Sequence, residues 1–306
     1  MKTPVAVFAY RRPRHLDQAL VALGQCVRLD DCHVHIFCDG PRGDEDAARV
    51  ASTREIARAW AARHPARVVE RDENRGLARS IAGEVSALCA ESGRVIVLED
   101  DLQPAPDFLV FMLAALDRYA CEPRVMQVAG FRPRFPWLGG GDACLLPCTT
   151  TWGWATWQRA WQHFAWEPAG IEQLRDPAVR RAFDLGDSYP YSQMLEDRLA
   201  GRNDSWGILW WWAVFRARGL VLYPRESLVT VGGFDGSGTH CDEGSGALVH
   251  GQSAGRFPWE GAVFPDRVEP DPAALRELGK ILRAGTSAPG GISAWWRRLQ
   301  SMLSPR

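Results

Sequence analysis

Three consecutive acids, Glu99, Asp100 and Asp101, follow the apolar run 95–98 in the segment VIVLEDDLQPAP. Adjacent carboxylates repel one another, and a carboxylate at the end of a buried strand is costly unless a positive charge neutralises it. Hard divalent cations such as Mn²⁺ and Mg²⁺ bind carboxylate oxygens together with phosphate oxygens and water. Acids ahead of prolines also form ordinary turns and helix caps. Taken alone, the three acids leave a metal–diphosphate site and a simple turn both open.

The elements that position these acids alternate between strand and helix in the first half of the chain. Buried-strand patterns occupy 4–10, 34–40, 66–71, 94–101 and 124–130, and helical apolar spacing occupies 16–23, 44–64, 77–88 and 108–119. This alternation predicts an α/β fold: a Rossmann-like, mostly parallel sheet with helices on both faces. Ligands bind such sheets beyond the carboxyl ends of the strands, where Asp39 and the three acids lie.

The second half is less regular and contains most of the clustered tryptophans. We interpret 131–285 as a mixed α+β region that packs on the same sheet and forms the other wall of a cleft, with 1–130 as the first half of the domain. Tryptophan packs well in cores and interfaces and also stacks on sugar rings, so both uses stay open for Trp152 and Trp154.

Composition excludes several classes of protein. The chain has 306 residues and a formal net charge of −1, which does not favour binding to nucleic acid. Its eight scattered cysteines predict neither a disulfide framework nor a zinc site. The first residues lack the pattern of a signal peptide, and no apolar run is long enough to span a membrane, so we expect a cytoplasmic protein.

The segment 286–306 has a separate pattern. Its apolar residues form one stripe on a helix, with Arg297 and Arg298 off that stripe. This is typical of a short interfacial helix, which predicts peripheral attachment to the inner face of the cytoplasmic membrane. Docking of the stripe on the protein's own core, or on a partner, is the alternative. Gly290 and Gly291 form a plausible hinge before it.

The order of several motifs resembles a known family. They are PVAVFAYRRPRHLDQAL, IFCDG, ENRGLARSI, VIVLEDDLQPAPDFL, TTWGWATWQRAW and DSWGILWWWAVFRARGLVLYPRESLV, and together they cover about 4–241. In this order they resemble metal-dependent glycosyltransferases of the A-type (GT-A) fold. The similarity is to the N-acetylglucosaminyltransferase I group and to bacterial sugar transferases of polysaccharide and lipopolysaccharide synthesis.

The resemblance implies roles on the nucleotide side. Arg11 or Arg12 would contact the diphosphate, and Asp39 would accept a hydrogen bond from the nucleobase; a solvated turn arginine and a plain Asp-Gly turn are the alternatives. Glu73 and Asn74 would border the nucleotide where the animal enzymes carry a histidine, which leaves the nucleobase open although a UDP-sugar is favoured.

It also implies how the acids divide their work. Glu99 and Asp100 would approach the base, ribose or donor sugar, while Asp101 would be the protein ligand of Mn²⁺ or Mg²⁺. Neighbouring side chains at a strand end diverge, which is consistent with this division. His240, in the glycine-rich segment GFDGSGTHC, would be a second metal ligand. The alternative is that it is simply exposed.

The implied reaction is attack by an acceptor hydroxyl on the anomeric carbon of the donor, with inversion. Asp204, before a tryptophan-rich helix, would be the general base, although an aspartate there also suits an N-cap. Glu196 and Asp197 are reserve candidates. Trp152 and Trp154 would line the cleft, and the acceptor would be a glycan or lipid-linked glycan.

Two other functions remain possible from the sequence. A sugar nucleotidyltransferase would need a glycine-rich phosphate loop after the first strand, where this chain has AYRRPRHL. A non-catalytic carbohydrate-binding protein would use the tryptophans for recognition and the acids only for structure.

Overall fold

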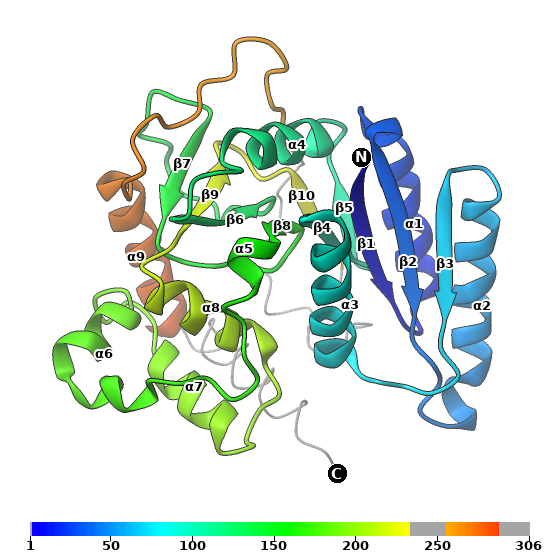
Figure 1. Ribbon diagram of the computed structural model, residues 1–306, viewed down its shortest axis with the longest axis horizontal. Coiled ribbons are helices and arrows are strands. Elements are labelled where there is room, and N and C mark those ends of the chain that lie inside the picture. Colours follow the sequence, from blue (N-terminus) through cyan, green and yellow to red (C-terminus); the bar gives the residue numbers. More distant parts are fainter. Residues whose placement is uncertain (1, 233–254, 288–306) are drawn as a thin grey trace.

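The computed structural model describes residues 2–232 and 255–287, with side chains described as far as residue 284. Its main sheet has eight strands: β1 (Thr3–Ala9), β2 (Cys32–Cys38), β3 (Ala66–Glu70), β4 (Arg94–Glu99), β6 (Val125–Ala129), β7 (Ala143–Leu146), β8 (Trp154–Trp157) and β9 (Leu220–Pro224). Their order across the sheet is β3-β2-β1-β4-β8-β6-β9-β7 (Figure 1). A second, two-stranded sheet pairs β5 (Leu102–Pro104) with β10 (Val229–Val231).

The helices are α1 (Pro13–Gly24), α2 (Asp44–Ala61), α3 (Leu77–Ser92), α4 (Phe108–Arg118), α5 (Gln158–Trp161), α6 (Pro177–Phe183), α7 (Tyr191–Leu199), α8 (Trp206–Arg216) and α9 (Pro272–Ser287). Two short 3₁₀ helices span Leu29–Asp31 and Ile171–Arg175. The first three long helices each connect two parallel strands, which cannot be joined by a tight turn.

The strand directions confirm the predicted α/β class. β1 is parallel to both β2 and β4, β2 is parallel to β3, and β6 is parallel to β9. β8 runs antiparallel between β4 and β6, and β7 is antiparallel to β9 at the edge. The sheet is therefore mostly parallel, as the alternating pattern of the first half predicts.

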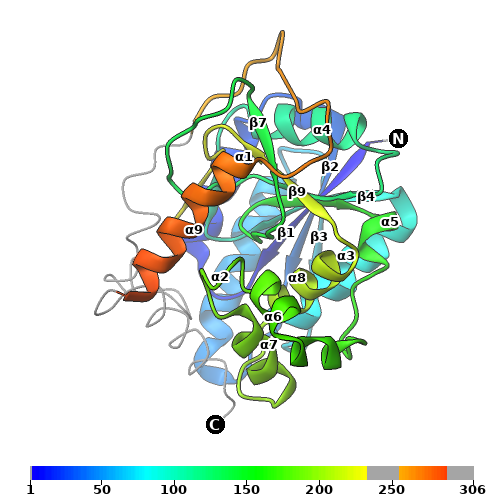
Figure 2. The same cartoon turned by 90° about the vertical axis from the view of Figure 1, so that its left-hand side faces the viewer.

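Helices cover both faces of the sheet, which explains why its strands read as continuous apolar runs. All seven residues of β1 are buried. Side chains of α1, α2 and α4 pack on one face, and those of α3, α5 and α8 pack on the other. The α9 helix closes a third cluster against β6, β7 and β9, along the side that Figure 2 turns to the viewer.

One strand in the centre of the sheet was not predicted. β8 comes from the tryptophan-rich second half, yet it lies between β4 and β6, so both halves of the chain share one sheet. Four buried residues, WATW, form this strand. The resemblance to glycosyltransferases instead implied that this segment lines a cleft.

The predicted interfacial segment lies almost wholly outside the described residues, since only its first two positions belong to α9. None of the helices in the described ranges is both long and apolar enough to cross a membrane.

Candidate active site

Four loops meet at the carboxyl edge of the parallel strands. They follow β1, β2, β3 and β4, and the strands are neighbours in the sheet. Backbone hydrogen bonds continue past the strand ends: the N–H of Asp39 donates to Ala9 at 3.0 Å, and that of Arg71 donates to Cys38 at 3.1 Å. The loops therefore start from a rigid edge, which is where this class of sheet binds ligands.

Arg12 supplies a positive charge next to the three acids. Its guanidinium donates one hydrogen bond to Asp100 and another to Asp101, the latter at 2.9 Å. The backbone N–H of Tyr10 also approaches Asp100, at 3.4 Å. Arg12 is the N-cap residue of α1, directly before Pro13. The start of this helix therefore places the Arg12 guanidinium beside the acids.

The acid cluster nevertheless lacks positive charge. Burial and the charge of Asp101 raise the pKa of Glu99 to about 8, although Arg12 opposes the shift. Burial likewise raises the pKa of Asp100 against the opposing effect of Arg12. Burial alone would lower the pKa of Arg12, but Asp100 and Asp101 outweigh it and raise that pKa above its ordinary value. Three carboxylates share one cation, so another cation would be stabilised here.

The residues present suit a divalent metal of the Mn²⁺ or Mg²⁺ kind. Within 2–232 and 255–287 no group of three or more histidine, cysteine or acidic side chains is arranged to hold a metal unaided. A cation here would take carboxylate oxygen from Asp101, whose side chain is 14% exposed, and its other ligands from phosphate and water. His240, the predicted second ligand, lies outside the described residues.

Asp39 ties two loops together. Its carboxylate accepts hydrogen bonds from the backbone N–H groups of Arg75 at 3.0 Å, Gly76 at 3.0 Å and Gly40 at 3.1 Å. Gly76, with φ of +77°, is the N-cap of α3 and adopts a backbone conformation that favours glycine. The structure thus supports the Asp-Gly turn left open by the sequence. The predicted contact of Asp39 with a nucleobase remains a prediction.

Asn74 has a similar bridging position, whereas Glu73 is exposed. The side-chain amide of Asn74 donates to the carbonyl of Gly40 at 2.9 Å, and its oxygen accepts from Arg42 at 3.3 Å. Gly40 allows this contact, because a Cβ there would lie 2.4 Å from the carbonyl carbon of Glu73. The loops after β2 and β3 therefore form one wall.

Arg11 and Arg12 have different partners. Arg11 pairs with Asp46 in the first turn of α2, at 2.5 Å, and the hydroxyl of Tyr10 donates to the same carboxylate at 2.5 Å. Of the two candidate arginines, Arg12 is therefore the one that meets the acid cluster. Arg11 holds the start of α2 against the loop after β1.

Asp204 lies in the loop between α7 and α8 and is exposed. Partial loss of water contact raises its pKa, while the charges of Arg198 and Arg42 act in the opposite direction. Arg42 belongs to the loop after β2, so its charge acts on Asp204 from that loop. The cap of α8 is Ser205, with no side-chain cap bond, so the structure does not support N-capping by Asp204.

The reserve acids are engaged elsewhere. Glu196 pairs with Arg180, and Asp197 pairs with Arg202 at 2.6 Å. Both pairs link α7 to neighbouring segments, which favours the structural reading of these acids.

The two predicted stacking residues differ. Trp154 is fully buried, and its ring packs against Trp161, Trp206 and Trp210 at centroid distances of 5.6 to 6.4 Å. The prediction that Trp154 stacks on a sugar is therefore wrong, because neighbouring rings cover it. Trp152 is only partly buried and meets Phe131 edge-on at 4.7 Å, so its stacking role remains a prediction.

Arg42 is the residue of this edge that the sequence analysis missed. It contacts Asn74, places its guanidinium 5.8 Å from the centre of the Tyr10 ring, and its charge opposes the rise that burial causes in the pKa of Asp204. Its position two residues after the Asp-Gly pair, in DGPRG, was the available signal. Arg42 thus links the loop after β2 to the loops after β1 and β3.

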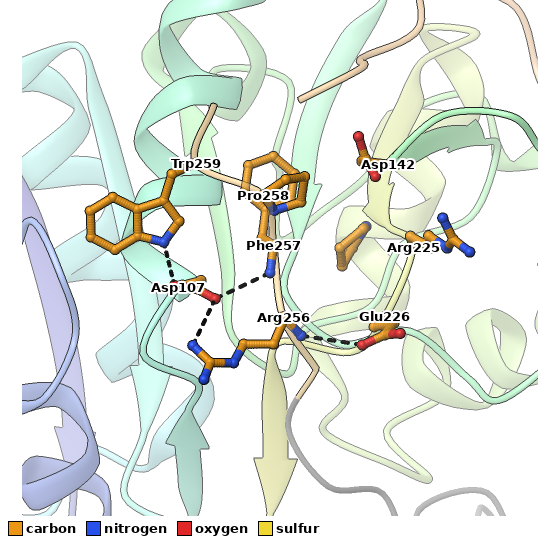
Figure 3. Close-up of a pocket in the computed structure, with 9 residues that line it drawn as sticks. Asp107, Asp142, Arg225, Glu226, Arg256, Phe257, Pro258 and Trp259 are labelled. Carbon is orange, nitrogen blue, oxygen red and sulfur yellow. Dashed lines mark hydrogen bonds and ion pairs between the residues drawn. The ribbon is translucent and has the colours of Figure 1, made fainter. Parts of the chain in front are cut away.

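A separate cavity of about 450 Å³ lies near the start of α4 (Figure 3). Asp107 in its wall accepts hydrogen bonds from Trp259 Nε1 at 2.6 Å and from the N–H of Phe257 at 3.2 Å. Asp107 follows β5, whereas the acid cluster precedes it. Because the predicted site residues are not among those that line this cavity, we keep it apart from the candidate active site.

Comparisons with known proteins are limited to partial structural likeness. No family model and no curated protein matches this chain. The mannosyltransferase PcManGT from Pyrobaculum calidifontis, in complex with GDP-Man and Mn²⁺, is 22% identical with a TM-score of 0.33 over 44% of this chain and 36% of that chain. S. aureus TarS in complex with UDP-GlcNAc is 11% identical with a TM-score of 0.45, over 75% of this chain and 57% of that chain.

Mouse xyloside xylosyltransferase 1 is 12% identical with a TM-score of 0.39, over 70% of this chain and 81% of that chain. The present chain spans only part of several of these proteins. It covers 36% of the mannosyltransferase, and it covers 50% of one further TarS chain and 36% of another. Two of these names describe glycosyltransferases, the class that the sequence motifs resemble. The likeness is partial, and the case for a function therefore rests on the site itself.

Proposed function

We propose that this protein is a metal-dependent glycosyltransferase that moves a sugar from a nucleoside-diphosphate sugar to a hydroxyl acceptor. The observation that carries the proposal is the cluster of Glu99, Asp100 and Asp101 at the carboxyl edge, with Arg12 as its cation. This cluster suits a ligand that brings a diphosphate together with a divalent cation. The ordered motifs of the sequence support the same reading.

In this proposal Asp101 holds Mn²⁺ or Mg²⁺, with His240 as a second ligand. When bound, the metal supplies charge stabilisation for the departing diphosphate. Arg12 offers planar paired N–H donors that suit phosphate oxygens. Glu99 and Asp100 orient the ribose or donor sugar. The wall built by Asp39, Glu73 and Asn74 receives the base.

Asp204 is the proposed general base. Its carboxylate is exposed, is not used as a helix cap and is influenced by a cation of the nucleotide side. It would take the proton of the acceptor hydroxyl as that oxygen attacks the anomeric carbon from the face opposite the diphosphate, which inverts the configuration. A raised pKa makes this carboxylate a stronger base than an ordinary aspartate.

We further propose a UDP-sugar donor of the hexosyl or N-acetylhexosaminyl type and a glycan or lipid-linked glycan acceptor. In this proposal the donor and the acceptor are substrates of a reaction in the synthesis of cell-surface polysaccharide or lipopolysaccharide. The protein would work in the cytoplasm, peripherally attached to the inner membrane surface by the segment 286–306.

The first test is a thermal-shift titration with UDP, GDP, dTDP and CMP, each with and without Mn²⁺. A ligand that binds only the folded protein stabilises it by about 2.7 kcal/mol at 100 times its Kd. A rise in Tm with one nucleoside diphosphate, present only with Mn²⁺, is the expected result. No response from folded protein to any of these nucleotides would contradict the proposal and favour a carbohydrate-binding protein.

Asp101→Asn tests the site directly. The variant should lose the Mn²⁺-dependent part of the Tm rise and the transfer of sugar to acceptor. Asp31→Asn is the matched control, since Asp31 is 54% exposed and pairs with Arg28 in the same turn. Full transfer activity in Asp101→Asn would show that the metal assignment is wrong.

A further inference from the structure

We infer that Arg12 is an exchangeable counter-ion, which makes binding of the divalent cation conditional on the nucleoside diphosphate. The inference rests on the proposed function of the site. It adds that Arg12 and the cation compete for Asp101, and that the diphosphate resolves this competition by giving Arg12 another anionic partner.

The geometry of the cluster sets up the competition. Arg12 uses both ends of its guanidinium, one N–H on Asp100 and one on Asp101. A cation on Asp101 would share that carboxylate with the guanidinium and would be repelled by it at close range. Arg12 and a divalent cation therefore cannot both make their best contact with Asp101.

Arg12 has a route to a new partner. Its side chain is 19% exposed, and it precedes the first helical residue of α1, so it can turn without disturbing the helix. It would turn toward the carboxyl edge of the parallel strands, where the proposed function places the diphosphate. Arginine binds phosphate oxygens with the same paired N–H groups that it uses for carboxylates.

The adjacent arginine cannot take over this role. Arg11 is held by Asp46 on α2, and the hydroxyl of Tyr10 shares that carboxylate. The loop after β1 thus carries one fixed arginine and one whose partners belong to the site. Exchange at Arg12 would couple the two ligands: each would bind more tightly in the presence of the other, and by the same factor.

The test is a Mn²⁺ titration of the full chain, followed by the EPR signal of free Mn²⁺, with and without UDP. In the absence of UDP, Arg12→Gln should bind Mn²⁺ about tenfold or more tightly than the unaltered protein, within the usual range of coupling between sites. UDP should tighten Mn²⁺ binding in the unaltered protein, and this gain should be about tenfold smaller in Arg12→Gln, where only the phosphate oxygens that bind the cation contribute to it. Arg11→Gln, which removes the same charge one residue away, should leave the UDP-free Mn²⁺ affinity unchanged.

Arg12→Lys separates exchange from simple charge repulsion and serves if Arg12→Gln fails to fold. Lysine keeps the charge but lacks the planar fork whose two separate N–H ends contact Asp100 and Asp101, so it should hold Asp101 less firmly and tighten UDP-free Mn²⁺ binding. Adding Asp101→Asn to either variant should abolish the gain.

Two results separate this inference from the proposed function. The exchange inference is overturned if either Arg12→Lys or Arg12→Gln has the same UDP-free Mn²⁺ affinity as the unaltered protein. That result would leave the proposal of nucleotide binding intact. If UDP, GDP, dTDP and CMP all fail to change Tm or Mn²⁺ affinity, the glycosyl-transfer proposal falls, and the exchange inference falls with it.

Discussion

Replacement of Asp39 tests whether this carboxylate is mainly a structural link between loops. In the structure it accepts the N–H groups of Arg75 and Gly76, at 3.0 Å each, and it is 7% exposed. Asp39→Ala would leave two donors without an acceptor. A donor that loses its partner in a buried place costs about 1–3 kcal/mol. Because Arg75 is exposed and water can reach part of this loop, we expect a loss of about 2–4 kcal/mol in the free energy of unfolding.

The assay is urea unfolding, followed by far-UV circular dichroism, of Asp39→Ala and of Asp39→Asn. Asparagine retains one oxygen that can accept, so it should lose less stability than alanine. Asp72→Asn is the control, since Asp72 is an exposed aspartate of the neighbouring loop. The m-value should stay constant, which shows that the change lies in stability and not in the extent of unfolding.

Two results would refute the reasoning. A loss below about 0.5 kcal/mol in Asp39→Ala, the level of an ordinary surface change, would mean that the hydrogen bonds from Arg75 and Gly76 contribute little. A normal stability together with a large loss of nucleotide affinity would show instead that Asp39 acts on the nucleobase, as the resemblance implies.

Three other predictions concern the core, the base and a close backbone contact. Trp154→Ala should cost about 3–5 kcal/mol in urea unfolding, as for other buried tryptophans, whereas a stacking role would lower sugar affinity with little loss of stability. Asp204→Asn should abolish transfer but retain Mn²⁺-dependent UDP binding; near-normal rates would exclude Asp204 as the base. Because burial raises the pKa of Asp204, its carboxylate is protonated at higher pH than an ordinary aspartate, so kcat/KM should fall on acidification at a higher pH than an unshifted aspartate would give. Gly40→Ala should cost about 1–3 kcal/mol, since its Cβ would lie 2.4 Å from the backbone of Glu73; an unchanged Tm would contradict this.

Much of the first half could be predicted because its signals are local. Buried strands of a parallel sheet appear as continuous apolar runs, and the helices between them repeat at helical spacing. The carboxyl ends of such strands must meet at one edge, so Asp39 and the three acids could be brought together without coordinates. The pairing of Arg12 with two of these acids could not, since neighbouring arginines in one turn look alike in sequence.

The second half was harder to predict because its elements depend on distant partners. WATW forms β8 because β4 and β6 offer free edges on either side of it, and no property of four residues specifies that place. This place in the sheet puts Trp154 under the rings of Trp161, Trp206 and Trp210, which excludes the stacking role that its residue type suggested. A tryptophan beside a predicted site is ambiguous until the strand order is known.

The acids themselves show what residue types can and cannot specify. From the sequence, three adjacent carboxylates require a cation but do not reveal which one. The structure supplies one, Arg12, yet the pKa of Glu99 still stands at about 8, well above its ordinary value. Burial is the largest cause of this shift, since the strand end holds Glu99 away from water. The contacts of Arg12 with both Asp100 and Asp101, at the edge where such sheets bind ligands, are the reason to regard the cluster as a site and not as a turn.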